Sequence, residues 1–377
     1  MWAVTIQKID AINPIPNADS IEVADVLGWK VVVKKGEFKS GDLCIYIPID
    51  SIVPPNNPYF DFMKDRGYRV CTIKLRKQLS QGLIVPLSLL KTIYNGELSV
   101  GTEVQKELGI CKYEKETRIA SSGKWYKRLH GKTMPSFIKK TDEERIQNLG
   151  WESLSGIDDT WEITEKLNGS SLTVYYDPLK ATRYERIVFW IKSYINKFKK
   201  VWELQRPELG LCSRNVDLSE DLFKKSKTNL YVQATLNSKL NEAVEKYCFI
   251  SGRKLAFQGE MIGPGIQGNY YSHPIHTVKL FKIWDIDNQF YLFPQEVTQI
   301  LTDIKSWFGI EVEQVPQINT IHKLNSQFKD RQAILDYADD FSVLKPILRE
   351  GLVFKSCSRR NESFKVVSNK YLLKEKE

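Results

Sequence analysis

The chain has 377 residues, of which 42% are hydrophobic and 27% are charged. This length is enough for two or three domains with sizeable cores, and the composition is that of a globular protein. No apolar run is long enough to span a bilayer and the first residues have no secretory pattern, so we expect neither a membrane protein nor a secreted one. The net charge of +9 suits a nucleic-acid partner but is weak support alone.

The cysteine and histidine patterns argue against disulfides and zinc. The six cysteines are scattered and include no Cys-x-x-Cys pair. We therefore expect reduced core cysteines in a protein of the cytoplasm. The four histidines do not fall at zinc-binding spacing from the cysteines, so no structural zinc is expected.

Residues 1–112 are predicted to be all-β. Short β-like runs lie at residues 4–9, 21–27, 29–33 and 43–48. Turns rich in Asn, Pro, Gly and Asp separate these runs, and closely spaced short strands fit a small barrel. Further along, Lys74, Arg76 and Lys77 either follow a phosphate backbone or only solvate one face of the barrel.

Two segments follow before the next β-like region. Residues 113–140 are rich in Lys, Arg and Ser without clear periodicity, which predicts a linker or a mobile basic arm. A helix is predicted over residues 141–150, because Thr141 can act as its N-cap, Glu144 completes a capping box and Gly150 can end it.

The stretch 161–176 predicts a β-hairpin. Apolar and polar residues alternate up to Lys166, residues 167–170 form a turn signal, and residues 172–176 form the return strand. Lys166 therefore stands at the mouth of the hairpin, and Gly169 allows backbone to pass close to whatever that lysine touches. A surface lysine beside a turn would show the same Lys-x-x-Gly pattern, so the hairpin alone does not establish a site.

The remaining helices are predicted from apolar spacing. A basic amphipathic helix is expected as an insertion at residues 183–209, docked on its own domain or, alternatively, contacting RNA, a partner or a membrane surface. Further helices are predicted at residues 232–247, 295–308 and 329–337.

Five charged islands follow the hairpin, each on or beside a short β-like run. They lie at residues 212–215, 257–265, 279–285, 349–356 and 363–370. With the Lys166 hairpin, they resemble motifs I, Ia, III, IIIa, IV and V of the covalent nucleotidyltransferases, which are the DNA ligases, RNA ligases and mRNA capping enzymes. One such motif would be weak, whereas six in the same order form a strong signal.

Two further segments narrow the resemblance. Residues 12–21 resemble the opening of OB-fold tRNA-binding modules, and residues 134–149 resemble the segment before motif I in the ATP-dependent RNA ligases of the Naegleria and Deinococcus type. That family places an N-terminal OB domain before its nucleotidyltransferase domain. The resemblance implies an α+β fold. Its parts would be an RNA-engaging, OB-like β-barrel at 1–112 and an ATP-grasp-like nucleotidyltransferase domain of antiparallel sheets and helices at 141–377.

The resemblance also implies a reaction, the joining of RNA 3′-hydroxyl and 5′-phosphate ends by a monomer in RNA repair, with ATP and Mg²⁺ or Mn²⁺ as cofactors. Lys166 would attack the α-phosphate of ATP, AMP would pass to the RNA 5′-phosphate, and the 3′-hydroxyl would displace AMP. An ordinary lysine has a pKa of about 10.4. The metal, Lys355 and Lys365 are therefore expected to favour the neutral amine and to neutralise charge on the α-phosphate.

The resemblance assigns nucleotide contacts to four more residues. Arg145 would contact the ATP phosphates, and Arg214 would contact the nucleotide or the RNA end. Glu165 would lie at the adenine edge, and Phe281 would stack on adenine. Each of these residues alone would have an ordinary structural role, so the joint pattern carries the assignment.

The metal would be held largely through water by oxygen ligands. Glu350 is the acid expected near it, and Glu260 would bind the ribose or a metal-bound water. The sequence departs from the family in two places. Many relatives have Asp or His where Asn168 stands, which weakens its case as a metal contact. Motif V often reads Lys-x-Lys, but a valine follows Lys365 at that spacing, and Lys370 is a candidate substitute.

Other members of the superfamily fit less well. DNA ligases and capping enzymes usually carry the OB domain after motif V, whereas the OB-like region comes first here. An alternative hypothesis, from a different functional class, is a non-catalytic RNA-binding protein. The joint presence of Lys166, Glu260, Glu350 and Lys365 argues against it.

Overall fold

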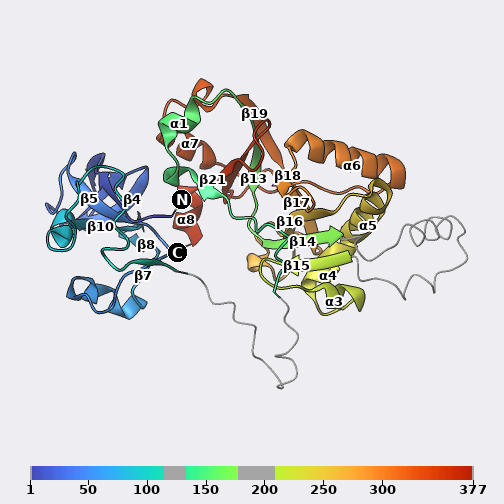
Figure 1. Ribbon diagram of the computed structural model, residues 1–377, viewed down its shortest axis with the longest axis horizontal. Helices are drawn as coiled ribbons and strands as arrows, with labels where there is room; N and C mark the ends of the chain where they lie inside the picture. Colours follow the sequence, from blue (N-terminus) through green and yellow to red (C-terminus); the bar gives the residue numbers. More distant parts are fainter. Residues whose placement is uncertain (1, 114–132, 177–208, 376–377) are drawn as a thin grey trace, which may run out of the picture.

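The computed structural model describes residues 2–113, 133–176 and 209–375, and Figure 1 shows them as a β-rich N-terminal part joined to a larger C-terminal part. No helix among these residues is long and apolar enough to cross a membrane. The predicted α+β class is confirmed, because strands dominate the N-terminal part and the C-terminal part mixes sheets with helices.

The N-terminal part is a barrel of short antiparallel strands. One sheet has the order β1 (Thr5–Lys8), β5 (Leu43–Ile47) and β10 (Leu83–Pro86), and a second has β2 (Ala11–Pro14), β3 (Ile21–Val26) and β4 (Trp29–Lys34). Smaller pairings join β6 (Ser51–Ile52) to β7 (Arg69–Val70) and β11 (Cys111–Lys112), and β8 (Thr72–Leu75) to β9 (Gln78–Gln81). The 3₁₀ helices are η1 (Pro58–Arg66) and η2 (Leu87–Leu90). Alternate side chains such as Ile6, Val31 and Ile45 fill two small cores inside the barrel.

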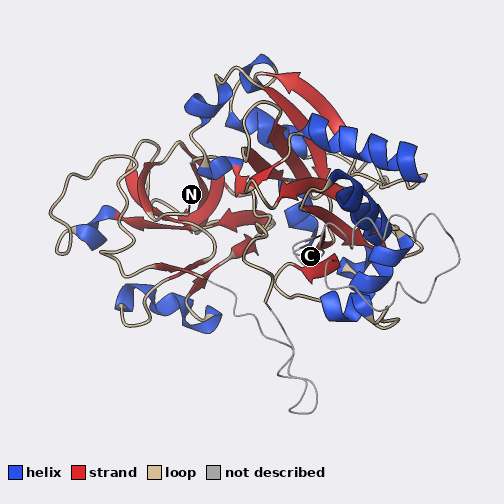
Figure 2. Cartoon of the chain, turned by 45° about the vertical axis from the view of Figure 1, so that its right-hand side comes forward, coloured by secondary structure: helices blue, strands red, loops and turns tan. Residues whose placement is uncertain are grey.

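Two five-stranded sheets form the centre of the C-terminal part. The first has the order β12 (Glu144–Arg145), β21 (Ser363–Val367), β20 (Gly351–Ser356), β13 (Thr160–Lys166) and β19 (Gln317–His322). The second has β15 (Leu209–Ser213), β14 (Ser170–Tyr176), β16 (Leu255–Ile262), β17 (Thr277–Asp285) and β18 (Phe290–Tyr291). Figure 2 shows the strands near the middle of this part and the helices toward its outside.

Helices cover the outer face of each sheet. The helices are α1 (Trp151–Ser155), α3 (Ser219–Phe223), α4 (Leu230–Asn237), α5 (Leu240–Ser251), α6 (Pro294–Phe308), α7 (Arg331–Ala338) and α8 (Asn369–Glu375), with 3₁₀ turns η4 (Ile146–Asn148), η7 (Gln267–Asn269) and η8 (Leu324–Ser326). Trp161, Phe354 and Phe364 of the first sheet pack with α7 in one core. Leu172 and Leu280 of the second sheet pack with α4, α5 and α6 in another.

The opposite faces of the two sheets turn toward each other and carry polar and charged side chains, together with an apolar cluster of Ala256, Trp284 and Tyr291 on the second sheet. Side chains alternate along a strand, so Glu162, Thr164 and Lys166 lie on the face of β13 away from Trp161 and Ile163. A direct contact joins the two polar faces, because the Nζ of Lys282 on β17 donates to the Oγ of Ser363 on β21 at 2.6 Å. We call the space between these faces the inter-sheet cleft.

Four sequence-based predictions need correction. The β-hairpin predicted at 161–176 is wrong, because β13 pairs with β19 and β20 in the first sheet, whereas β14 pairs with β15 and β16 in the second. The helix predicted at 141–150 is wrong, because Glu144 and Arg145 form β12 and pair in parallel with Phe364 and Lys365. Pairing with the sheet edge overrides the local capping signal, and only η4 and the short α1 follow. The helix predicted at 232–247 is divided into α4 and α5, because Lys239 between them has a left-handed φ of 53°.

The predicted linker at 113–140 is also partly structured. Residues 114–132 lie outside the described part, but Ile138 is buried against Ala256 and Trp284 of the second sheet. The N–H of Met134 donates to the carbonyl of Asn215 at 3.0 Å. The predicted insertion helix at 183–209 falls almost wholly outside the described residues. The helices predicted at 295–308 and 329–337 correspond to α6 and α7.

Candidate active site

Lys166 ends β13 and faces the inter-sheet cleft. Its Nζ lies 2.5 Å from Oε1 of Glu350, and both side chains are mostly buried, with 27% and 19% exposed. The contact depends on Gly351, which pairs with Lys166 across the strands. Gly351 has a φ of 155°, and a Cβ there would come within 2.1 Å of the Val366 carbonyl oxygen. A glycine at this position therefore lets β20 begin directly after Glu350 and sets that carboxylate against the lysine.

The turn after Lys166 brings the second sheet to the same place. A Cβ on Gly169 would lie 2.4 Å from the Met261 carbonyl oxygen and 2.8 Å from Cγ of Glu260, so the turn can approach β16 only as glycine. The backbone N–H of Asn168 donates to the Tyr271 hydroxyl at 2.8 Å, which fixes the turn. The structure gives the Asn168 side chain no hydrogen bond to another described residue.

Glu260 lies on β16 opposite Ser171 and faces the cleft. Burial raises the pKa of its carboxyl to about 8, the nearby Lys166 charge opposes this shift, and the Glu350 charge adds to it. Lys166, Glu350 and Glu260 thus meet where the ends of β13, β20 and β16 converge. Two carboxyl groups held apart by one ammonium suit a divalent cation.

The cation would reach the protein mainly through water. No group of three or more His, Cys, Asp or Glu side chains able to hold a metal occurs within residues 2–113, 133–176 and 209–375. The donors that are present are the carboxylates of Glu350 and Glu260 and the neutral amide of Asn168. This oxygen-only set fits Mg²⁺ or Mn²⁺ with a water shell, and it does not fit zinc.

Glu165 points out of the cleft. It is only 1% exposed, and its Oε2 accepts a hydrogen bond from the Val343 N–H at 2.9 Å. Burial raises the pKa of this carboxyl. The sequence suggested Glu165 for the adenine edge. Since its side chain lies on the face of β13 opposite to Lys166, only its backbone is placed to border the cleft.

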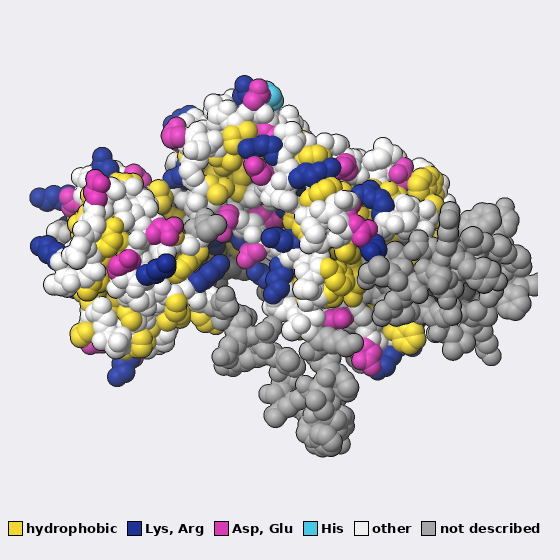
Figure 3. Space-filling model, viewed as in Figure 1, with side chains coloured by type: hydrophobic (Ala, Val, Ile, Leu, Met, Phe, Trp, Pro, Cys, Tyr) yellow, Lys and Arg dark blue, Asp and Glu magenta, His cyan; other side chains and the backbone are white. Residues whose placement is uncertain are grey.

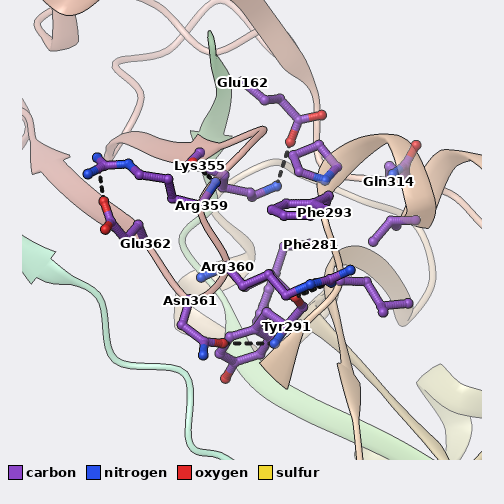
Figure 4. A pocket seen from close by; sticks show the side chains of 15 residues that line it. Glu162, Phe281, Tyr291, Phe293, Gln314, Lys355, Arg359, Arg360, Asn361 and Glu362 are labelled. Atoms are coloured by element: carbon purple, nitrogen blue, oxygen red, sulfur yellow. Dashed lines mark hydrogen bonds and ion pairs between the residues drawn. The ribbon is translucent and has the colours of Figure 1, made fainter. Parts of the chain in front are cut away.

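Lys355 and Phe281 lie farther along the cleft. The Nζ of Lys355 is 2.9 Å from Oε2 of Glu162, its cross-strand partner on β13. Four strand residues, or about 13 Å, separate this level from Lys166, so Lys355 is not a neighbour of Lys166. Figure 4 shows Lys355, Glu162 and Phe281 lining a pocket together with Phe293. This pocket forms the end of the cleft that lies away from Lys166.

Two other cations of the site, Lys365 and Arg214, both contact Asp142. The Nζ of Lys365 on β21 lies 3.3 Å from Oδ1 of Asp142, and Nη2 of Arg214 lies 3.3 Å from Oδ2 of the same carboxylate. Burial lowers the pKa of Lys365. Lys370, the candidate second motif V lysine, is the second residue of α8, and its backbone N–H donates to Oδ1 of Asp339 at 3.1 Å.

Arg145 joins the site to the barrel. It lies beside Lys365 in the β12–β21 pair, and its guanidinium carbon is 5.4 Å from the ring centroid of Trp29 on β4. Burial lowers the pKa of this guanidinium, and its Nη1 is buried without a hydrogen-bond partner among the described residues. Sequence reasoning missed Trp29 and Asp142. Trp29 was missed because the sequence of β4 has the pattern of a core strand. Asp142 was missed because residues 141–150 have a helix-capping pattern.

The raised pKa of Glu260 has a consequence for stability. Its ordinary value is 4.5 and its folded value about 8, so the folded protein binds more protons than the unfolded chain between these pH values. Without metal, the free energy of unfolding should therefore fall as the pH rises through this window. Glu260→Gln should remove that fall. Melting temperatures of both proteins in EDTA, at pH values across the window, check this; parallel curves would contradict it.

Comparisons with known proteins match both parts of this architecture. Residues 3–87 match an OB-fold domain family and residues 159–371 match the RNA ligase family. A comparison with curated proteins gives no match.

Among solved structures, the chain is similar to Naegleria gruberi RNA ligase. An aspartate-to-alanine variant without ligands is 34% identical with a TM-score of 0.72, covering 100% of this chain and 98% of that one. The ligase with pyrophosphate is also 34% identical, with a TM-score of 0.72 and coverages of 100% and 99%. A lysine-to-alanine variant with ATP and manganese is 33% identical, with a TM-score of 0.72 and 99% coverage of both chains.

The similarity to the Naegleria ligase extends over the whole length of this chain. This chain therefore belongs to the RNA ligase family and is an ATP-dependent RNA ligase with an N-terminal OB fold.

Proposed function

We propose that this ligase seals RNA 3′-hydroxyl and 5′-phosphate ends through a lysyl-AMP on Lys166 and an adenylylated RNA. The observation that carries the proposal is the 2.5 Å contact between Lys166 and Glu350, with Glu260 facing them from the other sheet. A lysine held at the meeting point of two sheets, among carboxylates that suit a divalent cation, is positioned to act as a nucleophile on a phosphate.

In the first step, Lys166 attacks as the neutral amine, after its ammonium proton passes to the Glu350 carboxylate. Its Nζ forms a bond to the α-phosphorus of ATP, the bond from that phosphorus to the β-phosphate oxygen breaks, and the nitrogen releases its second proton to solvent. Pyrophosphate leaves with the electron pair. Glu350 orients the amine for this attack. A bound Mg²⁺ or Mn²⁺ supplies positive charge that neutralises the α-phosphate. Lys365 and Arg145, on neighbouring strands, are placed to bind the phosphates that leave.

The nucleotide base would extend along β13, away from Lys166. On the cleft face the cross-strand pairs are Lys166 with Gly351, Thr164 with Val353, and Glu162 with Lys355. Phe281 lines the pocket at the Glu162 end, so an aromatic ring is available to stack on the base there. In this orientation Lys355 serves the base end of the site, and the α-phosphate end is served by Lys365.

The later steps use RNA. The RNA 5′-phosphate oxygen attacks the phosphorus of lysyl-AMP and frees Lys166. The RNA 3′-hydroxyl then attacks the 5′-phosphorus, and AMP leaves. Figure 3 shows Lys and Arg side chains, with some Asp and Glu among them, around the hollow between the barrel and the larger part. A phosphate backbone can follow such a basic surface.

Substitution of the nucleophile tests the proposal. Lys166→Ala should reduce labelling of the protein by α-labelled ATP to background and abolish sealing of a nicked RNA duplex. Lys224→Ala is a matched control, because Lys224 is also 2.5 Å from a carboxylate, Glu220, but is the exposed C-cap residue of α3. Labelling by GTP instead of ATP, or full labelling of Lys166→Ala, would contradict the proposal.

Asn168 predicts a weaker hold on the metal. Solved variants of the Naegleria ligase replace a lysine and, two residues later, an aspartate, and Asn168 stands two residues after Lys166 here. A neutral amide binds a metal-held water less strongly than a carboxylate does. Asn168→Asp should therefore lower, by several-fold, the Mn²⁺ concentration that gives half-maximal adenylylation. Unchanged metal dependence would mean that Asn168 only stabilises the turn.

The β8–β9 hairpin of the barrel is the part best suited to hold RNA. Its tip residues, Arg76 and Lys77, are exposed and have left-handed φ values of 49° and 63°. Such a two-residue turn favours Asn-Gly, so a pair of cations there costs backbone strain. Lys74 in the same hairpin donates to the Leu373 carbonyl of α8 at 3.3 Å. The hairpin thus places two cations beside the helix that follows motif V.

The double substitution Arg76→Asn and Lys77→Gly removes both charges from the turn without destabilising the fold, so it tests whether these charges bind RNA. The double variant suits the turn better, so its melting temperature should equal or exceed that of the wild type. Its affinity for nicked RNA should fall, and the slope of log affinity against log salt should lose about one to two units. Self-adenylylation should not change. Unaltered affinity and salt slope would exclude the hairpin from the RNA path.

A further inference from the structure

Residues 139–145, which we call the strap, cross from one sheet to the other at the inter-sheet cleft. On the second sheet, Gln258 donates to the Lys139 carbonyl at 2.8 Å and Lys282 contacts Oε1 of Glu143 at 2.6 Å. The strap then enters the first sheet as β12. Because both of its ends are fixed, the strap holds Asp142 over the cleft.

Asp142 bridges two cations that come from different sheets. One carboxylate oxygen lies 3.3 Å from Nζ of Lys365 on β21, and the other lies 3.3 Å from Nη2 of Arg214, directly after β15. A phosphate group also presents several anionic oxygens to cations on more than one side. The Asp142 carboxylate therefore occupies a place where a phosphate would make the same contacts.

The charges at this place do not balance without a ligand. Lys166 has Glu350 as its partner, but Lys365 and Arg214 share the single carboxylate of Asp142. Arg145, next to Lys365, has no carboxylate partner among the described ion pairs and leaves a buried Nη1 unbonded. The surplus of cations favours a multiply charged anion. Once that anion is bound, a carboxylate between its two contacts would repel it.

The side chain can leave without moving the strap. Asp142 is 59% exposed and Arg214 60% exposed, so the carboxylate can turn into solvent while Lys139 and Glu143 stay anchored. The exposed pair with Arg214 contributes only about 0 to 1 kcal/mol, whereas Lys365 in the other pair is 22% exposed. A pyrophosphate, with more charge, can therefore displace the carboxylate.

We propose that Asp142 is an internal competitor for a phosphate site formed by Lys365 and Arg214. Before the nucleotide binds, the carboxylate holds the two cations in position across the cleft. A phosphate then displaces it, and it returns when pyrophosphate leaves. The residue thereby weakens retention of the product. The existence of this anion site does not depend on the ligase reaction, whereas its assignment to the ATP phosphates rests on the function proposed above.

Calorimetric titration of the full chain with inorganic pyrophosphate tests the competition without any catalytic step. Asp142→Asn should bind pyrophosphate about three- to tenfold more tightly than the wild type, as the loss of one or two exposed ion pairs implies. Asp142→Glu, which keeps the charge, should stay close to the wild type. The gain should shrink as salt is raised, because exposed charges are screened.

Two controls isolate the site. Asp287→Asn removes a similarly exposed carboxylate, paired with Lys254 at 3.1 Å outside the cleft, and should leave pyrophosphate affinity unchanged. Lys365→Ala should cancel the gain of Asp142→Asn in the double variant. A gain that persists without Lys365 would overturn the proposal, as would a folded Asp142→Asn protein that binds neither pyrophosphate nor 5′-phosphate RNA more tightly than the wild type.

Two further measurements show which phosphate group uses the site, and whether Asp142 competes with that group or only positions Lys365. If the gain appears with an RNA bearing a 5′-phosphate but not with pyrophosphate or a 5′-hydroxyl RNA, the competitor acts on the RNA end. A gain with pyrophosphate assigns the site to the ATP phosphates. In self-adenylylation, Asp142→Asn should lower KM for ATP with little change in kcat. A fall in kcat at unchanged KM would show that Asp142 only positions Lys365, which contradicts competition.

Discussion

The contact between Lys166 and Glu350 is the constraint on which the site depends. A mostly buried ammonium needs an anion beside it, and a mostly buried carboxylate needs a cation, so each residue requires the other. The pair can form because β20 begins at Gly351, where the backbone geometry and the nearby Val366 carbonyl exclude a side chain. The same pair of strands carries the core residues Trp161 and Phe354 on its other face. The positions of Lys166, Glu350 and the core residues are thus fixed by one strand register.

The second sheet completes the site through close backbone approach. Gly169 allows the turn after Lys166 to lie against β16, and this brings the Glu260 carboxyl toward Lys166. A carboxyl with a raised pKa, an ion pair and a surplus of cations all occur within the cleft, outside the two cores. These features cost stability in an empty site and favour a bound metal and phosphates, as expected where binding energy is used for chemistry.

The barrel and the catalytic part are connected through Arg145. Its guanidinium lies over Trp29 of the barrel while its strand neighbour is Lys365 of motif V. The sequence suggested that the barrel serves RNA and the C-terminal part serves ATP. That division remains a prediction, and the position of Arg145 gives the barrel a physical link to the phosphate end of the site.

The sequence predicted the features that depend on local patterns. Short β-runs and the amphipathic helices α6 and α7 follow from alternation and helical spacing, and the motif order identified the family. The two strands on either side of the Lys166 turn were also predicted, but their pairing as a hairpin was wrong, because they lie in different sheets. Features that depend on tertiary pairing could not be predicted. Residues 144–145 carry a helix-capping pattern but pair with β21.

Side-chain direction and long-range contacts also could not be predicted from the sequence. The direction of Glu165 depends on which face of β13 is buried. The distance of Lys355 from the nucleophile depends on the β13–β20 register. Asp142 shows no motif at all, because its significance comes from two cations that are distant from it in the sequence.

The central claim is that Lys166 is the residue that carries AMP. Peptide mapping by tandem mass spectrometry, after reaction of the wild-type protein with ATP and a divalent cation, tests it most directly. The account predicts an AMP group joined through a phosphoramide bond to Lys166 alone. An AMP group on another lysine, or a fully reacted protein without any covalent AMP, would contradict it.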